Sequence, residues 1–382
     1  MFITERELIS GKLCTGRQQV INKFKQRASI RFINIPTPTE EEEKNLLYLF
    51  SFSYLGEMLT QRLRRNRKSE AIRSLIQETR LHPSDFILPM FIKEGKSEAI
   101  ESMPDVYRHN LDSALHEIER ISKAGIKAVA LFPVVEESQK DESGSESVNP
   151  DSLIHNSIKK IKERFPDICL IADVALDPYT LHGHDGLIDN NGEILNDETV
   201  KELVQMALAQ ARAGVDMVAP SDMMDGRVSA IRKALDDHGF TNVSIHAYAA
   251  KYASSLYSPF RDALSSRLRF GDKLSYQLNP ANSREALLEA ALDEREGADV
   301  IMVKPAGYYL DIISKLKERS TLPISAYQVS GEYAMIKAAG QLGWIDEQKV
   351  LLESLMAIKR AGADMIFTYG ALEATLLIDH LK

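Results

Sequence analysis

Two lysines in this 382-residue sequence stand where they could do covalent chemistry on carbonyl compounds. Lys304 directly follows the apolar run 300–303, and Lys251 comes shortly after another run, 243–248. An ammonium at the end of a buried strand is partly desolvated, and a second cation nearby lowers its pKa further. Because only the free amine attacks a carbonyl carbon, the pair predicts Schiff-base catalysis, whereas either lysine alone is more often solvated or salt-bridged.

Other polar residues follow apolar runs and could serve the same site. Four of them stand at or just beyond the end of a run: Asp173, Asp222, Ser330 and Tyr369. Arg261 and Lys273 come later, after the run that precedes Lys251. Either could bind a substrate carboxylate, arginine through two parallel hydrogen bonds and lysine as a point charge. On spacing alone, a surface charge is the slightly favoured interpretation of each.

The segment 173–185 is the candidate metal site. Asp173, Asp177 and Asp185 offer oxygen ligands and His184 a nitrogen, but the segment contains no cysteine. The nearest thiol, Cys169, falls inside a predicted strand, so zinc held by a cysteine cluster is excluded here. Carboxylates and water are compatible with Mg²⁺.

These residues need a scaffold that brings strand ends together. Eight short apolar runs recur, separated by segments with helical spacing: 86–92, 128–134, 168–174, 215–220, 243–248, 299–304, 323–329 and 364–369. Near-continuous apolar strands are typical of a parallel sheet buried on both faces. Strand and helix alternating over roughly 290 residues predict an α/β fold, a (β/α)8 TIM barrel with its active site at the carboxyl ends of the strands. A doubly wound open sheet is the alternative, but no Gly-x-Gly-x-x-Gly follows the first run.

The chain before the first strand lies outside this pattern. We expect an N-terminal extension without fixed order over residues 1–60, a basic arm helix within 61–85, and the catalytic barrel over 86–382. The arm could pack on a neighbouring subunit or be a solvated helix, and the sequence does not decide between them. Within the barrel, 136–150 reads as a loop, and a turn at 190–192 predicts a small hairpin.

Composition narrows the class of protein. A net charge of −8 argues against a nucleic-acid partner, and no apolar run approaches the length of a membrane span. Two cysteines in a large chain favour a cytoplasmic enzyme. Residues 1–31 are basic and poor in acids, which leaves an organelle transit peptide as the less favoured alternative.

From about residue 63 onward the chain closely resembles the porphobilinogen synthase (δ-aminolevulinic acid dehydratase) family. The matching motifs keep the family's order: ETRL (78–81), SMP (102–104), DVALDPY (173–179), GHDG (183–186), APSDMMDGR (219–227), AKYAS (250–254), MVKP (302–305) and VSGE (329–332). The resemblance implies condensation of two 5-aminolevulinate molecules to porphobilinogen with loss of two waters, an early step of tetrapyrrole (haem) synthesis.

The resemblance also implies a role for each site residue. Lys304 would bind the substrate that becomes the propionate side, and Lys251 the one that becomes the acetate side. Asp173 and Asp222 would assist proton transfers. Arg261 and Lys273 would bind one substrate carboxylate, and Ser330 with Tyr369 the other. Gln277 would also bind substrate, and Tyr257 with the loop 258–269 would form a lid.

The chain departs from the family pattern at several positions. Zinc-type members carry three cysteines where this chain has Ala175, Asp177 and Asp185, so the resemblance implies no catalytic zinc at a cysteine site. It implies instead a magnesium-responsive homo-octamer, with an allosteric Mg²⁺ at Glu289 and Asp177 and Asp185 as weaker metal candidates. Lys273 replaces an arginine, Ser258 a glycine, and His246-Ala247 a Met-Ser pair.

Two other functions fit parts of the pattern. A single-lysine aldolase acting on a phosphorylated sugar is one, but it should have a glycine-rich phosphate site after the last two strands, and 369–372 is a poor match. A non-catalytic barrel is the other, and the presence of both lysines with their anchors speaks against it.

Overall fold

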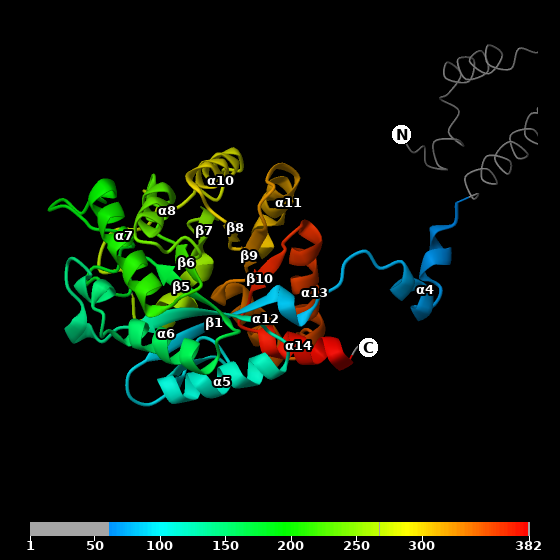
Figure 1. The fold of residues 1–382 in the computed structure, drawn as a ribbon. Helices are drawn as coiled ribbons and strands as arrows, with labels where there is room; N and C mark the ends of the chain where they lie inside the picture. The colour runs from blue at the N-terminus through cyan, green and yellow to red at the C-terminus, as the bar shows by residue number, and fades with distance from the viewer. Residues whose placement is uncertain (1–60, 267, 381–382) are drawn as a thin grey trace, which may run out of the picture. The chain divides into compact units, whose positions relative to one another are not determined.

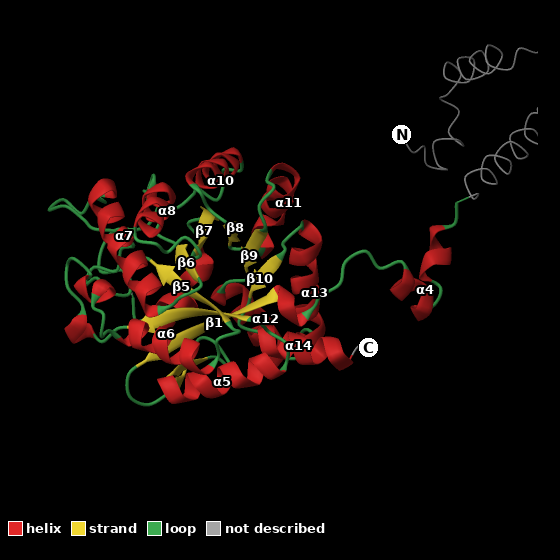
Figure 2. Cartoon of the chain, in the orientation of Figure 1, coloured by secondary structure: helices red, strands yellow, loops and turns green. Residues whose placement is uncertain are grey.

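Eight parallel strands close into a barrel in the computed structural model, which describes residues 61–266 and 268–380 (Figures 1 and 2). The barrel strands are β1 (Phe86–Lys93), β4 (Ala128–Val134), β5 (Cys169–Val174), β6 (Met217–Pro220), β7 (Ser244–Lys251), β8 (Val300–Lys304), β9 (Ile324–Tyr327) and β10 (Met365–Phe367). Each pairs with the next, and β10 pairs back onto β1 through Phe86 and Ile366. The predicted TIM barrel is confirmed.

Helices cover the outside of the barrel (Figure 2). They are α5 (Leu111–Lys123), α6 (Leu153–Arg164), α7 (Asn196–Ala213), α8 (Arg227–Asp237), α10 (Arg284–Glu296), α11 (Leu310–Arg319), α12 (Ser330–Gln341), α13 (Glu347–Ala361) and α14 (Ala371–His380). A short helix, α9 (Ser258–Ala263), lies in the segment after β7, and 3-10 turns stand at Pro83–Asp85, Glu137–Gln139, Ser145–Val148, Ser255–Tyr257 and Gly307–Tyr309.

The strands are apolar throughout because each faces two cores. Along β1, Phe86, Leu88 and Met90 pack outward against the helices, whereas Ile87 and Phe91 point into the barrel. Side chains alternate between the two faces of a strand, so both sets must be apolar. Two small strands, β2 (Glu98–Ala99) and β3 (Tyr107–His109), extend the sheet at the carboxyl end of β1.

Glycines end the helices that precede several strands. Gly214 follows α7 with φ 102°, and Gly297 follows α10 with φ 103°. Residues with a Cβ rarely adopt this left-handed conformation, so glycine here lets the chain turn directly into β6 and β8.

Strand β7 is longer than the sequence predicted. The expected strand ended at residue 248, but β7 continues to Lys251 through a register shift between Ala247 and Ala250. Tyr248 points into the barrel, whereas Ala249 and Ala250 both pack in the outer core. The irregularity therefore moves Lys251 onto the inner side, which regular alternation from Tyr248 would have denied it.

The described residues before Glu78 belong to a separate unit. The single arm helix predicted within 61–85 is instead a 3-10 turn (Leu63–Arg67) and a short helix, α4 (Glu70–Leu75). Ser69 separates them because it adopts an extended conformation and its side chain accepts a hydrogen bond from the Ile72 amide at 3.4 Å, which caps the second helix. The predicted extension over residues 1–60 lies outside the described residues.

Residues around the turn at 190–192 form a small hairpin. The predicted hairpin is confirmed, because Ile188 and Ile194 form an antiparallel bridge and the Asp189 amide donates to the Glu193 carbonyl at 2.9 Å. Within the described ranges, no helix combines the length and apolar character needed to cross a membrane.

Candidate active site

Lys251 and Lys304 lie side by side at the carboxyl ends of β7 and β8. They are register partners on neighbouring strands, and each is only 6% exposed. The parallel sheet brings both strand ends to the same rim, and the irregularity in β7 turns Lys251 inward. The two predicted lysines therefore share one enclosed site.

Aromatic rings surround the Lys304 ammonium. Its Nζ lies 4.5 to 5.4 Å from four ring centres, those of Tyr327, Tyr248, Phe260 and Tyr257. Ring faces attract a cation but replace only part of the hydration that it loses. Burial, followed by the charge of Lys251, lowers the pKa of Lys304 to about 7. A substantial fraction of Lys304 is therefore free amine at neutral pH, the form that attacks a carbonyl carbon.

Lys251 has different surroundings. Its Nζ donates a hydrogen bond to Asp185 Oδ2 at 3.2 Å and another to the carbonyl oxygen of Ser221. A carboxylate and a carbonyl thus stand where Lys304 has aromatic rings. The two amines differ in environment although they are neighbours, which suits separate tasks in one reaction.

Asp173 and Asp222 hold protons more tightly than ordinary carboxyl groups. Asp173 is half-buried as a residue, but protein surrounds its carboxyl group. Burial together with the charge of Asp177 raises the pKa of this carboxyl group to about 7. Asp222 is fully buried, and burial raises its pKa to about 6 although Arg227 opposes the change. Its Oδ1 accepts a hydrogen bond from the Met224 amide at 2.7 Å. Both groups can take up or release a proton near neutral pH.

Lys273 stands between the two carboxylates of the candidate metal site. Its Nζ lies 2.6 Å from Asp185 Oδ1 and 3.6 Å from Asp177 Oδ2. Burial raises the pKa of Asp185, but the charges of Lys251 and Lys273 outweigh it and hold that pKa well below its usual range. Burial also raises the pKa of Asp177, against the charge of Lys273.

The position of the Lys273 ammonium limits which residues could hold a metal ion. With an ammonium between them, Asp177 and Asp185 do not fit a metal ion, and the described ranges contain no cluster of three or more metal-ligating side chains. Glu289 lies on α10, one of the helices that cover the outside of the barrel (Figure 2). It is half-buried, and burial raises its pKa although the charge of Arg227 opposes this. One carboxylate fits Mg²⁺ only where the ion keeps most of its waters.

The segment after β7 covers the lysines. Tyr257 donates its hydroxyl hydrogen to the Tyr252 carbonyl at 2.7 Å, and the Phe260 amide donates to Ser330 Oγ at 3.0 Å. The Phe260 ring contacts two rings of the barrel interior, with centres 5.6 and 5.2 Å away. Gly331 must be glycine here, because a Cβ would lie 2.5 Å from the Leu256 carbonyl oxygen.

The remaining predicted anchors lie on two sides of the lysines. Arg261 is half-buried in α9, and its charge opposes the raised pKa of Lys273. Gln277 is 5% exposed, and its side-chain oxygen Oε1 is buried without a hydrogen-bond partner. On the other side, Tyr369 shares a hydrogen bond of 3.0 Å with the hydroxyl of Tyr327. The orphaned Gln277 oxygen is available to a ligand.

Sequence reasoning missed two groups of residues around the site. The aromatic rings around Lys304 went unnoticed, although Tyr248 and Tyr327 stand at inward positions of predicted strands. The other group centres on Arg227, for which the sequence predicted no role of its own. It is fully buried, donates to both oxygens of Asp293 at 3.2 and 3.1 Å, and lies 3.6 Å from Asp222.

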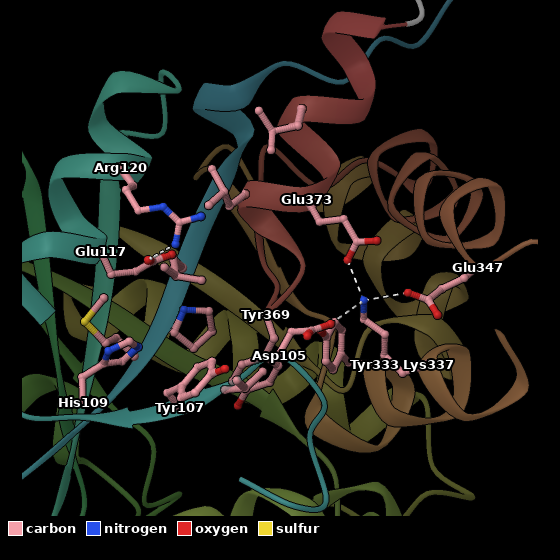
Figure 3. A pocket seen from close by; sticks show the side chains of 16 residues that line it. Asp105, Tyr107, His109, Glu117, Arg120, Tyr333, Lys337, Glu347, Tyr369 and Glu373 are labelled. Atoms are coloured by element: carbon pink, nitrogen blue, oxygen red, sulfur yellow. Dashed lines mark hydrogen bonds and ion pairs between the residues drawn. The ribbon is translucent and has the colours of Figure 1, made fainter. Parts of the chain in front are cut away.

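A cavity of about 550 Å³ is lined by Tyr369, one of the predicted anchors, but by neither lysine (Figure 3). Its lining includes Leu88 and Met90, which point outward from β1, and the Lys337 ammonium, which is paired with Glu347 at 2.7 Å and Glu373 at 2.8 Å. Leu88 and Met90 place part of the cavity on the outer side of the barrel wall, whereas Tyr333 and Tyr369 belong to the inner cluster. The chemistry lies at the two lysines, which do not line this cavity.

Comparison with known proteins gives consistent results. A family model described as delta-aminolevulinic acid dehydratase matches residues 60–377. The delta-aminolevulinic acid dehydratase of Chlamydia pneumoniae is 56% identical over 315 residues, covering 82% of this chain and 95% of the relative. The chloroplastic enzyme of Oryza sativa subsp. japonica is 55% identical over 321 residues, covering 83% and 75%. The crystal structure of the Toxoplasma gondii ME49 enzyme in complex with the product porphobilinogen has a TM-score of 0.82 and 52% identity, covering 83% of this chain and 91% of that one.

Proposed function

We propose that Lys251 and Lys304 each hold one substrate molecule as a Schiff base, because this chain belongs to the delta-aminolevulinic acid dehydratase family. It has the activity of that family, the condensation of 5-aminolevulinate to porphobilinogen in tetrapyrrole synthesis. The pairing of the two lysines at the ends of β7 and β8 carries this proposal. Family membership also removes the single-lysine aldolase and the non-catalytic barrel as alternatives.

The two amines take different parts in the proposed reaction. Lys304, with its pKa of about 7, is free to attack the C4 carbonyl of the substrate that becomes the propionate side. Lys251 binds the C4 carbonyl of the second substrate, the acetate side. Each Schiff base forms with loss of one water, and the lysine nitrogens leave again as the pyrrole ring closes, which balances two substrates against one product and two waters.

Asp173 and Asp222 are proposed to move protons between these steps. Their raised pKa values, about 7 and about 6, let each carboxyl group act as acid or base near neutral pH. The charge of Lys251 opposes both raised values, which supports their closeness to that amine.

Two sets of residues are proposed to bind the substrate carboxylates. Arg261, Lys273 and Gln277 form one set, supported by the charge coupling of Arg261 with Lys273 and by the burial of Gln277, whose amide nitrogen can donate to a carboxylate. Lys273 must then share its ammonium between Asp185 and the substrate. Ser330 and Tyr369 form the other set, and the segment with Tyr257 closes over both.

We place the chain in the subtype that lacks cysteine-bound zinc and responds to Mg²⁺. The support is chemical: Ala175, Asp177 and Asp185 supply no thiolate, and the sequence has only two cysteines. Glu289 is the proposed residue for an allosteric Mg²⁺ that keeps its waters. When bound there, the ion would supply a positive charge beside α10, outside the reacting centre.

One assay tests the activity and the metal assignment together. The protein is incubated with 5-aminolevulinate in a chelator, then with added Mg²⁺ or Zn²⁺, and porphobilinogen is measured. We expect product, with stimulation by Mg²⁺ that Glu289→Gln removes and Glu285→Gln, an exposed carboxylate on the same helix, does not. Absence of product under every condition would refute the two-lysine reaction, and stimulation by Zn²⁺ alone would refute the metal assignment.

The proposal also includes an oligomeric state and a cellular compartment for the protein. We propose a homo-octamer to which residues 61–85 contribute an arm, and light scattering of the purified protein gives the mass that tests it. We propose the cytoplasm as the compartment, with residues 1–31 as a transit peptide in the alternative. Tracking a fluorescent fusion of residues 1–60 distinguishes the two.

A further inference from the structure

The segment that covers the lysines has carbonyl groups at its end that accept hydrogen bonds from two cationic side chains outside the segment. This lid segment, residues 257–266, contains the six-residue helix α9 and the turn after it. Arg108 Nε donates to the Ala263 carbonyl at 2.6 Å, and Arg108 Nη2 donates to the Asp262 carbonyl at 2.7 Å. Lys140 Nζ donates to the Ser265 carbonyl at 3.1 Å. The Asp262 carbonyl also accepts from the Ser265 amide at 3.2 Å, and the two cations add charged donors at the end of α9 and in the turn after it, where helix carbonyls run out of partners within the helix.

Both cations are held on the rim of the barrel and not on the lid segment. Arg108 lies in β3, which pairs with β1, and its Nη1 donates to Glu98 at 3.0 Å. The Lys140 side chain is 3% exposed and lies 3.9 Å from Glu137. Arginine presents its N–H groups in a rigid fork, which matches the two adjacent carbonyls. We call Arg108 and Lys140 the rim latch.

The two ends of the lid segment are held in different ways. Its beginning is buried, because the Phe260 ring packs on Phe91 and Phe132 and lies 5.0 Å from Lys304 Nζ. Its end borders a cavity of about 450 Å³, whose lining includes both residues of the rim latch. Water in this cavity competes for the latched carbonyls, so the end of the segment is where opening would begin.

We propose that Arg108 and Lys140 are positioning residues that keep the lid segment closed over Lys304 and thereby keep water away from its amine. The proposal rests on the role of Lys304 given above. Loss of either cation frees carbonyls of the lid segment and lets Phe260 leave the amine. Since burial is the largest cause of the lowered pKa of Lys304, opening returns that pKa toward its ordinary value.

Hydrogen exchange of the full-length enzyme without substrate tests the latch directly. Arg108→Met and Lys140→Met remove the donors, and mass spectrometry follows the amides of the peptide that spans the lid segment. Hydrogen bonds from charged donors stabilise enough for a loss of protection of roughly tenfold to hundredfold on the lid segment alone. Arg164→Met is the matched control, because it breaks a half-exposed ion pair with Glu119 and should leave this protection unchanged.

Kinetics tests the consequence for the amine. We expect both latch variants to raise KM for 5-aminolevulinate more than they lower kcat, and to move the acidic limb of the pH–rate profile to higher pH. Arg108→Lys, which can serve one of the two carbonyls, should give an intermediate shift. A merely structural role would lower thermal stability without moving the limb.

The outcomes separate this proposal from the one it rests on. Unchanged exchange in the lid segment of folded Lys140→Met and Arg108→Lys overturns the latch, even if Arg108→Met does not fold. Increased exchange with an unmoved acidic limb overturns the link to the amine. If borohydride traps no substrate on Lys304 of the unaltered enzyme, the two-lysine reaction fails, while the exchange experiment still decides whether the latch exists.

Discussion

Replacing Lys251 by methionine tests whether the charge of one lysine sets the reactivity of the other. Lys304 has a pKa of about 7 against an ordinary value of 10.5. The difference of about 3.5 corresponds to roughly 5 kcal/mol against the charged form. At pH 7 about half of the Lys304 side chains are then free amine, whereas an unperturbed lysine would be free in roughly one molecule in three thousand.

The expected change follows from the order of the two causes. Burial is the larger cause and remains in Lys251→Met, because methionine has a similar length and the aromatic rings stay in place. The charge of Lys251 is the second cause and disappears. We therefore expect the pKa of Lys304 to rise by roughly one pH unit and to stay well below its ordinary value. A lysine is reactive above its pKa, so adduct formation should begin at higher pH in the variant.

Reductive trapping measures this pKa without requiring turnover. The enzyme is mixed with 5-aminolevulinate and borohydride at a series of pH values, and peptide mass spectrometry counts the adduct on Lys304. Lys304→Met should give no adduct at this position, and Lys315→Met, an exposed lysine on α11, should match the unaltered enzyme. A midpoint in Lys251→Met at or below that of the unaltered enzyme would show that the second charge does not activate the first.

Three further predictions concern buried charges, each read from thermal unfolding. Lys304→Met should be more stable than the unaltered protein at pH 7, by at most about 5 kcal/mol. The reason is that, between pH 7 and 10.5, Lys304 binds a proton in the unfolded unaltered protein but not in the folded one. The gain should vanish as pH rises to 10.5, and a lower melting temperature of the variant at pH 7 would contradict the prediction. Asp185→Ala should destabilise by roughly 3–5 kcal/mol, since two buried ammonium groups lose their shared carboxylate, and an unchanged melting temperature would argue against the pairing. Arg227→Met should cost a similar roughly 3–5 kcal/mol by leaving two buried carboxyl groups unpaired. The loss should shrink as pH falls toward 6, because Asp222 takes up its proton at higher pH without Arg227; a loss independent of pH would refute that cause.

The barrel could be predicted from the sequence because its signals are local. Each strand is an apolar run, and the glycines at 214 and 297 mark helix ends through their backbone conformation alone. Once the strands are known to be parallel, polar residues at their ends must meet at one rim. The two lysines could therefore be paired before any coordinates. The arm within 61–85 contains two short helical segments and not one helix, because the side chain of Ser69 caps a new helix.

The surroundings of each lysine were decided only by the tertiary structure. Lys251 faces inward because β7 inserts a residue between positions that pair with β8, and a shift of one residue reverses the side of every later side chain. The aromatic rings around Lys304 come from three separate segments, and Lys273 reaches Asp185 across 88 residues.

The sequence by itself therefore determined the fold, the family and the pair of amines, because residue type and local spacing carry that information. Only the tertiary structure decided that Lys304 lies among aromatic rings while Lys251 and Lys273 share a carboxylate. The physical reason is that a pKa depends on the burial and the charges within a few ångströms of a group, and those neighbours are distant in the chain.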